Sequence, residues 1–205
     1  PFILISKKRY TGDKYEFSAD LLKERTSMGI VMKRRDNAAI VKYVFGNVVE
    51  IIMNQKSVDK AMIWLEKTLE KIIKGEIDTS MFIISKSLSA YYKNPDGIAH
   101  KVLADRMGER NPGDKPKPND RIPFMYIKVD ESPIHNGYYK NGKPKLLKRK
   151  ILQGDRIEHP DFIKQQGLEI DYRFYISNQI MNPVKQILDL SKSEEETTAL
   201  FKKFI

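Results

Sequence analysis

Two neighbouring stretches with helical spacing of apolar residues limit most strongly how this chain can fold. Within residues 38–53 and again within residues 58–74, apolar side chains recur every three or four positions. This period places them on one face of a helix, and the face is wide enough to pack into a core. Ser57 is a typical N-cap for the second helix, and Gly75 is placed to end it. The pattern therefore predicts a pair of packed, antiparallel helices.

Shorter signals surround this pair. Asp36 or Asn37 is expected to cap the first helix. Pro183 is expected to kink a later helix or to begin a new one. Further helices are predicted at 96–107, 170–190 and 194–205. Strands are predicted at 2–5, 14–17, 28–32 and 122–127, with a turn at 11–13 and a hairpin tip at 140–143. The predicted fold class is α+β and mainly helical.

The overall charge of the chain indicates the kind of partner. The 205 residues carry a formal charge of +10, which favours a polyanion, most often a nucleic acid and less often an anionic membrane. There is no cysteine, which excludes disulfides and thiolate zinc sites. No apolar run approaches the roughly 20 residues of a transmembrane helix. Because the chain starts with Pro1, directly before a predicted strand, we expect it to be part of a longer protein.

A basic stretch near the start of the chain is the strongest candidate for a binding site. Lys7, Lys8 and Arg9 are followed by Tyr10 and come directly after an apolar run. Cations held at the end of a strand beside an aromatic ring suit the phosphate–sugar backbone of a nucleic acid. The alternative is a solvated lysine patch at a strand end.

A search for catalytic residues finds no established pattern. His100, His135 and His159 lie far apart without metal-ligand spacing. The sequence has no glycine-rich phosphate loop and no nucleophile elbow. The acidic pair Asp13 and Glu16 and the acidic run 194–196 are expected to form solvated faces. From its residues alone, the chain is predicted to be a basic, mainly helical binding module.

A series of short motifs runs through nearly the whole chain. They are SKKRY at 6–10, GI at 29–30, RRDN at 34–37, ISKSL at 84–88, ADRM at 104–107, DRIP at 120–123 and IDYRFY at 170–175. In this order they resemble the end of the palm and the start of the thumb of a family B DNA polymerase, nearest to the eukaryotic delta type. Residues 130–168 are longer and more basic than that pattern, which indicates an insertion and fits a divergent member such as that of a large DNA virus.

The resemblance implies a domain organisation. Residues 1–35 would complete the palm β-sheet, and residues 36–205 would form a helical thumb with a small β element and the basic insertion. The family's catalytic carboxylates, which bind two Mg²⁺ ions, would lie upstream of this chain. The chain itself would hold no cofactor and no catalytic residue. It would grip the duplex of primer and template during DNA replication.

The resemblance also implies which residues contact DNA. Residues 7–10, at the strand end, would touch the primer–template just behind the active site, partly from the minor groove. Residues 34 and 35, at the palm–thumb junction, would grip phosphates. The rest would line the thumb face along the duplex. The predicted DNA-binding residues are Lys7, Lys8, Arg9, Tyr10, Arg34, Arg35, Lys86, His100, Arg106 and Arg121.

Several of these residues have an alternative role. Arg35 could pair with Asp36 or an interior acid, and Arg106 could bridge to Asp105 or Glu109. His100 could be only a helix residue, and Tyr10 could belong to the core.

The resemblance also sets the expected partners and location. The expected partners are primer–template DNA and the palm, fingers and exonuclease parts of the same polymerase, and a membrane is not expected as a partner. The expected location is inside the cell, in a nucleus or a viral replication compartment. A sliding clamp is a further candidate, from the spacing of Leu200 and Phe204. The alternative function is a free-standing basic helical module for nucleic-acid binding or assembly, without polymerase activity.

Overall fold

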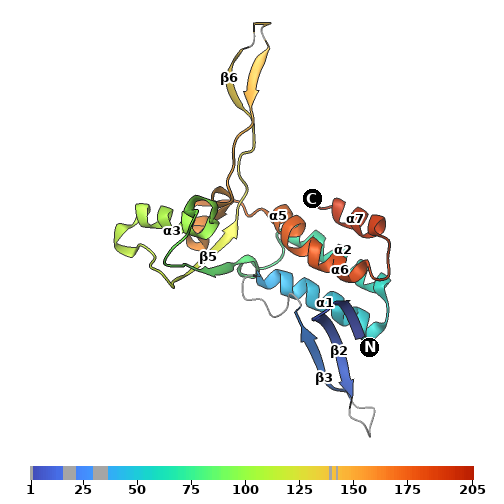
Figure 1. Ribbon diagram of the computed structural model, residues 1–205. Coiled ribbons are helices and arrows are strands. Elements are labelled where there is room, and N and C mark those ends of the chain that lie inside the picture. Colours follow the sequence, from blue (N-terminus) through green and yellow to red (C-terminus); the bar gives the residue numbers. More distant parts are fainter. Residues whose placement is uncertain (1, 16–21, 30–36, 139, 142) are drawn as a thin grey trace. The chain divides into compact units, whose positions relative to one another are not determined.

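The computed structural model describes residues 2–15, 22–29, 37–138, 140–141 and 143–205. The chain divides into two compact units. Figure 1 shows the chain coloured along its sequence, from blue at the N-terminus to red at the C-terminus. Unit 1 comprises Pro1–Ile84 and Tyr172–Ile205, and unit 2 comprises Ser85–Asp171. The described residues combine helices and strands, with more helix than strand, so the predicted mixed and mainly helical character is confirmed. The division into palm and thumb stays a prediction.

The predicted helix pair forms the centre of unit 1. Helix α1 spans Ala39–Gln55 and α2 spans Val58–Ile73, and the two pack against each other. The Ser57 hydroxyl accepts a hydrogen bond from the Lys60 backbone N–H, as expected of an N-cap. The cap predicted for α1 from Asn37 is wrong, because Ala38 occupies the N-cap position without a side-chain hydrogen bond. Asp36 lies outside the described residues.

The C-terminal part of the chain completes unit 1. It contains α5 (Tyr172–Tyr175), a π-helical turn (Ile176–Ile180), α6 (Met181–Leu188) and α7 (Glu194–Lys202). Pro183 lies near the start of α6, which continues directly from the π-helical turn, so the helical run extends through the proline rather than beginning anew at it. Ser193 and Glu196 form a capping box at the start of α7.

The core of unit 1 is built from the apolar faces of these helices. The Tyr175 hydroxyl donates a hydrogen bond of 2.6 Å to the Phe82 carbonyl oxygen, and the two rings meet edge to face. Trp64 is only half-buried and lies beside Tyr43. The fully buried large side chains of unit 1 include Ile40, Phe45, Leu65, Leu69, Ile72, Phe82, Tyr175 and Phe201.

A three-stranded antiparallel sheet precedes the helices in unit 1. Its strands are β1 (Phe2–Ser6), β2 (Arg9–Tyr15) and β3 (Leu22–Met28), in the order β1-β2-β3. The turn predicted at 11–13 is wrong, because these residues lie inside β2, where all three pair with β3 and Thr11 and Gly12 also pair with β1. Gly12 serves close packing instead, since a Cβ atom there would lie 2.4 Å from Cδ2 of Phe2.

Two other strand predictions are corrected at the same place. The strand predicted at 14–17 is the end of β2, which stops at Tyr15. The strand predicted at 28–32 meets the structure only at Met28, the last residue of β3, and residues 30–32 lie outside the described residues.

Unit 2 contains a small sheet, helices and a separate hairpin. The sheet order is β4-β5-β8, with β4 at Ile84–Ser87, β5 at Arg121–Tyr126 and β8 at Ile157–Glu158. Helix α3 spans Ala99–Arg110, three residues later than predicted, because residues 95–97 form a short 3₁₀ turn. Helix α4 spans Pro160–Gln166. The hairpin predicted around 140–143 is confirmed, with β6 at Ile134–Tyr138 and β7 at Pro144–Leu147.

Candidate nucleic-acid interface

The basic stretch of unit 1 lies in the tight turn between β1 and β2. Lys7 and Lys8 form this turn, and both side chains are exposed. Lys8 has a φ of 63°, which is uncommon for a residue with a side chain. Gly29, with a φ of 62°, packs so closely that a Cβ atom there would lie 2.2 Å from the Lys8 carbonyl oxygen. The backbone of the turn therefore packs directly against the backbone of Gly29.

The next two residues of the stretch face the protein. The Arg9 guanidinium donates a hydrogen bond to Oε1 of Gln186 on α6. The Tyr10 ring stacks on the Phe2 ring with centroids 5.6 Å apart. Both side chains are half-buried, so part of the core role considered for Tyr10 is observed. Within the stretch, Lys7 and Lys8 are the cations that point fully to solvent.

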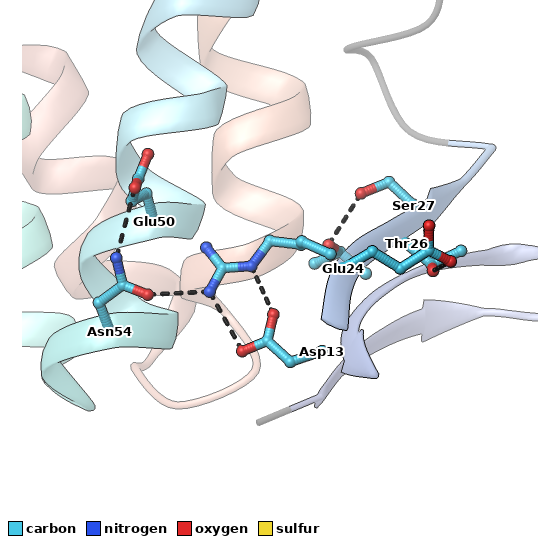
Figure 2. A network of polar contacts seen from close by, with 8 residues as sticks. Asp13, Glu24, Thr26, Ser27, Glu50 and Asn54 are labelled. Atoms are coloured by element: carbon cyan, nitrogen blue, oxygen red, sulfur yellow. Dashed lines mark hydrogen bonds and ion pairs between the residues drawn. The ribbon is translucent and has the colours of Figure 1, made fainter. Parts of the chain in front are cut away.

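A polar network joins the sheet to α1, as Figure 2 shows. Arg25 on β3 donates to both carboxylate oxygens of Asp13 on β2, at 2.6 and 3.1 Å. The same guanidinium donates to Oδ1 of Asn54 on α1 at 2.8 Å. Asn54 in turn donates to Glu50 at 3.3 Å. The sheet that carries Lys7 and Lys8 is thus tied to α1 through Arg25 and to α6 through Arg9.

Asp13 does not lie on a solvated acidic face, so the expectation from the sequence is wrong. Its side chain is only 3% exposed. The hydrogen bond from Arg25 lowers the pKa of the Asp13 carboxyl, against the opposing effect of burial. The pairing depends on the register that places Asp13 opposite Arg25. Two opposite charges twelve positions apart give no such signal before the register is known.

We expect Asp13→Asn to lower the free energy of unfolding by about 1–2 kcal/mol at neutral pH, because Arg25 loses its charged partner. Since the folded-state pKa lies below the unfolded one, this contribution is complete above the unfolded pKa. It is lost as the pH falls through the folded pKa, so variant and wild type should converge in acid. Denaturant unfolding at neutral and acidic pH measures this.

The matched control for this prediction is Lys14→Gln on the same sheet. It removes an exposed ion pair with Glu24, and exposed pairs contribute little to stability. If both variants were equally stable at neutral pH, the anchoring role of Asp13 would be wrong.

In unit 2, His100 on α3 lies close to Lys86 on β4. The Tyr92 hydroxyl accepts a hydrogen bond from the Ser89 N–H, and it lies within hydrogen-bond distance of Nε2 of His100, at 3.1 Å. Burial, and then the charge of Lys86, lower the pKa of the His100 imidazole. The lowered pKa favours the neutral form of the His100 imidazole, which can act as a hydrogen-bonding group.

Arg121 on β5 is fixed above β4. Its guanidinium donates to the hydroxyls of Ser85 and Ser87 and, at 2.6 Å, to the carbonyl oxygen of Ser85. The side chain is nevertheless exposed, and the cation is held in one orientation at the sheet surface.

Arg106 is engaged inside unit 2. It donates to the carbonyl oxygens of Gly154 and Ile157, and its Nε lies 3.4 Å from the Glu158 carboxylate. The alternative bridge to Asp105 or Glu109 is not observed among the described residues, where Arg106 pairs with Glu158 instead. These hydrogen bonds hold Arg106 within unit 2, and its predicted contact with DNA stays a prediction.

An open cleft of about 510 Å³ adjoins Arg121 in unit 2. Lys115, Lys117 and His159 line it, together with Asp114 and Asp120. This cleft adjoins a segment rich in Pro and Gly, residues 108–119, whose lysines were not among the predicted DNA-binding residues. The positions of Lys115 and Lys117 shortly before Arg121 were the sequence signal that could have indicated these additional cations.

The predicted residues thus fall into separate groups. Unit 1 presents Lys7 and Lys8, whereas unit 2 presents Lys86, His100 and Arg121. Arg34 and Arg35 lie outside the described residues. Leu200 and Phe204, considered for a sliding clamp, are buried in unit 1.

The described part of the chain holds neither a cluster of metal ligands nor a membrane-spanning helix. Within residues 2–15, 22–29, 37–138, 140–141 and 143–205, no three His, Asp or Glu side chains gather as a metal site would require. In the same residues, no helix has the length and apolar character needed to cross a membrane.

Comparison with known proteins identifies the family. The model of DNA polymerase family B matches residues 1–191, so the chain belongs to this family. It is 48% identical over 207 residues to a DNA polymerase of Acanthamoeba polyphaga mimivirus, covering all of this chain and 11% of that protein. It is 30% identical to the DNA polymerase delta catalytic subunit of Candida albicans, covering 98% of this chain and 17% of that subunit.

A solved structure has the same fold. The family B DNA polymerase from the hyperthermophilic archaeon Pyrobaculum calidifontis matches with a TM-score of 0.62 at 19% identity, over 94% of this chain and 22% of that one. The resemblance seen in the motifs is thereby confirmed. The chain spans less than a fifth of the length of the two polymerases compared above, so the activity of a whole polymerase is a proposal here.

Proposed function

We propose that this chain is the palm–thumb part of a DNA-directed DNA polymerase and that it holds the duplex of primer and template during synthesis. The observation that carries the proposal is the exposed Lys7–Lys8 turn, on a sheet anchored to two helices by Arg25 and Arg9. Membership of DNA polymerase family B supports it. The free-standing module is not favoured, since the family match covers most of the chain.

Held cations suit the task of gripping a duplex of any sequence. Lysines neutralise phosphates and release counterions, which gives affinity without reading bases. In the minor groove the acceptor pattern is nearly the same for A·T and T·A pairs, so donors placed there tolerate changing sequence. We extend this role to Lys86 and Arg121 in unit 2, with His100 as a neutral hydrogen-bonding group. Lys115 and Lys117 are added to the predicted contacts.

The proposal places the chemistry elsewhere in the polymerase. Two Mg²⁺ ions would act on the primer terminus and the incoming nucleotide. The described residues lack a cluster of acids suited to hold them, so we derive no metal-dependent step from this chain. We propose residues 1–35 as palm and 36–205 as thumb, acting with the other polymerase parts where DNA is replicated, in a nucleus or viral compartment. A clamp contact through Leu200 and Phe204 is not proposed, because both are buried.

The test is duplex binding by the full-length protein that carries this sequence, with Lys7→Gln/Lys8→Gln beside wild type. If both lysines contact phosphates, the slope of log Kd against log salt becomes shallower by about 1.8. Two duplexes of unrelated sequence should give the same slopes. Fluorescence anisotropy across a salt series measures this.

The control is Lys67→Gln/Lys71→Gln, which removes the same charge from exposed positions on α2. Its slope should equal that of wild type. An unchanged slope in the Lys7/Lys8 variant, with circular dichroism showing a folded protein, would contradict the proposed contact. No duplex binding by wild type at low salt would contradict the proposed function.

A further inference from the structure

The β6–β7 hairpin of unit 2 is a two-stranded ribbon that pairs with no other strand of the described chain. Ile134 lies opposite Leu147, and Tyr138 lies opposite Pro144. Figure 1 shows the two strands as a ribbon of their own. Isolated two-stranded hairpins are marginally stable in water, and sheets usually need a third strand or a packed helix. The ribbon therefore has a surface that something else is expected to cover.

The charge of the ribbon indicates the class of partner. Residues 140–150 contain six cations and no acid. Arg149 pairs with Asp130 at 3.2 Å, and Lys145 is half-buried. The ammonium groups of Lys140, Lys143, Lys148 and Lys150 are exposed, and none of them has an ion pair among the residues that the structure describes. A surface of this kind selects a polyanion over a neutral or basic partner.

The apolar part of the ribbon separates it from a simple solvated lysine tail. Ile134 is 48% exposed, Leu146 is 55% exposed and Tyr138 is 70% exposed. Exposed apolar side chains rimmed by cations are typical of a binding surface rather than of a spacer. The major groove of duplex DNA admits a two-stranded β-ribbon, with phosphates on both sides of it. Shape and charge therefore both favour duplex DNA.

We propose that the β6–β7 hairpin is a second DNA-contacting element, which inserts into a groove of the duplex while its lysines neutralise the flanking phosphates. This inference rests on the proposed function, that the chain holds duplex DNA. The contact is independent of sequence, because lysines on phosphates read no bases. It adds affinity that falls steeply with salt.

The test uses the full-length protein with Lys140→Gln, Lys143→Gln, Lys148→Gln and Lys150→Gln combined. The salt series on duplex DNA should show a slope shallower by up to about 3.6, because each phosphate that a lysine neutralises contributes about 0.9. The matched control combines Lys60→Gln, Lys67→Gln, Lys71→Gln and Lys74→Gln, which removes the same charge from exposed positions on and just after α2. That control should keep the wild-type slope.

A second variant tests the ribbon without relying on the lysine side chains. Because Ile134 and Leu147 are paired, residues 134–147 can be replaced by a short Asn-Gly turn. Among the described side chains of the ribbon none belongs to the buried hydrophobic core, so the melting temperature should stay that of wild type. The salt slope should also become shallower, by up to about 1.8 from the loss of Lys140 and Lys143, because Lys148 and Lys150 remain in this variant.

The outcomes separate this inference from the proposed function. If wild type binds duplex DNA and both hairpin variants keep its slope, the hairpin contact is wrong while the proposed function stands. If wild type binds no duplex, the proposed function fails first. If the hairpin variants lose binding only to phosphatidylserine vesicles and keep their DNA slope, the inference is overturned in favour of a membrane surface.

Discussion

Replacing Glu158 by Gln is expected to lower the free energy of unfolding by about 3 kcal/mol. The Glu158 side chain is only 4% exposed and accepts a hydrogen bond of 2.7 Å from Arg110. Nε of Arg106 lies 3.4 Å from the same oxygen and has no hydrogen bond of its own. The substitution removes the buried counter-charge of both guanidinium groups, although the Arg106 and Arg110 side chains themselves are 27% and 34% exposed.

This loss should depend on pH. Burial raises the pKa of the Glu158 carboxyl, but the hydrogen bonds from Arg110 and the His159 N–H, together with the charges of Arg106 and Arg110, outweigh it. The folded-state pKa is therefore lowered, and the stabilisation is complete above the unfolded pKa. It disappears as the pH falls through the folded pKa, so wild type should approach the variant in acid.

Denaturant unfolding at neutral and acidic pH measures the effect of Glu158→Gln. The control in the same unit is Glu169→Gln, whose ion pair with Lys128 is exposed and whose loss should change stability little. Equal stability of the two variants at neutral pH would contradict the role of Glu158. A difference that grew in acid would contradict the lowered pKa.

The substitution Gly29→Ala is expected to cost about 2 kcal/mol and to weaken duplex binding. Its φ of 62° disfavours any side chain, and the added Cβ would lie 2.2 Å from the carbonyl oxygen of Lys8. Because this clash is with backbone, the Lys7–Lys8 turn must move. We therefore expect the salt slope for duplex DNA to fall toward that of Lys7→Gln/Lys8→Gln, although no charge is removed.

Gly167→Ala is the matched control, since Gly167 has a φ of 64° but nothing within 4 Å of an added Cβ. It carries the backbone cost without the clash. Unfolding and DNA-binding measurements on both variants isolate the contact with Lys8. If Gly167→Ala destabilised the protein as much as Gly29→Ala, or if Gly29→Ala kept wild-type DNA binding, support of the turn by Gly29 would be wrong.

The long helices were predictable because their information is local. Apolar spacing, the Ser57 cap and Gly75 specify α1 and α2 within a residue or two of the observed bounds. The hairpin around 140–143 was predictable from its turn residues in the same way. The basic stretch at 7–10 was found as a charge cluster, and the family from motifs in their order.

The turn at Lys7 and Lys8 was missed because its determinants lie elsewhere. A Thr-Gly-Asp run normally favours a turn, but Gly12 accepts the Phe2 ring and stays in the strand. Lys8 adopts a left-handed conformation that nothing in its local sequence favours. The strand register, which depends on packing along the whole sheet, overrides the local preference.

The roles of single charged residues likewise depend on tertiary packing rather than on local sequence. The composition and motifs of this chain establish its helices, its positive charge and its family, because these follow from local spacing and from the order of residues. Only in the folded chain does Arg106 meet the carbonyl groups of Gly154 and Ile157, and Asp13 meet Arg25, while Lys7 and Lys8 stay exposed. Whether a cation is available to DNA depends on the acceptors that tertiary packing brings within about 3 Å of it, and sequence position does not encode that distance.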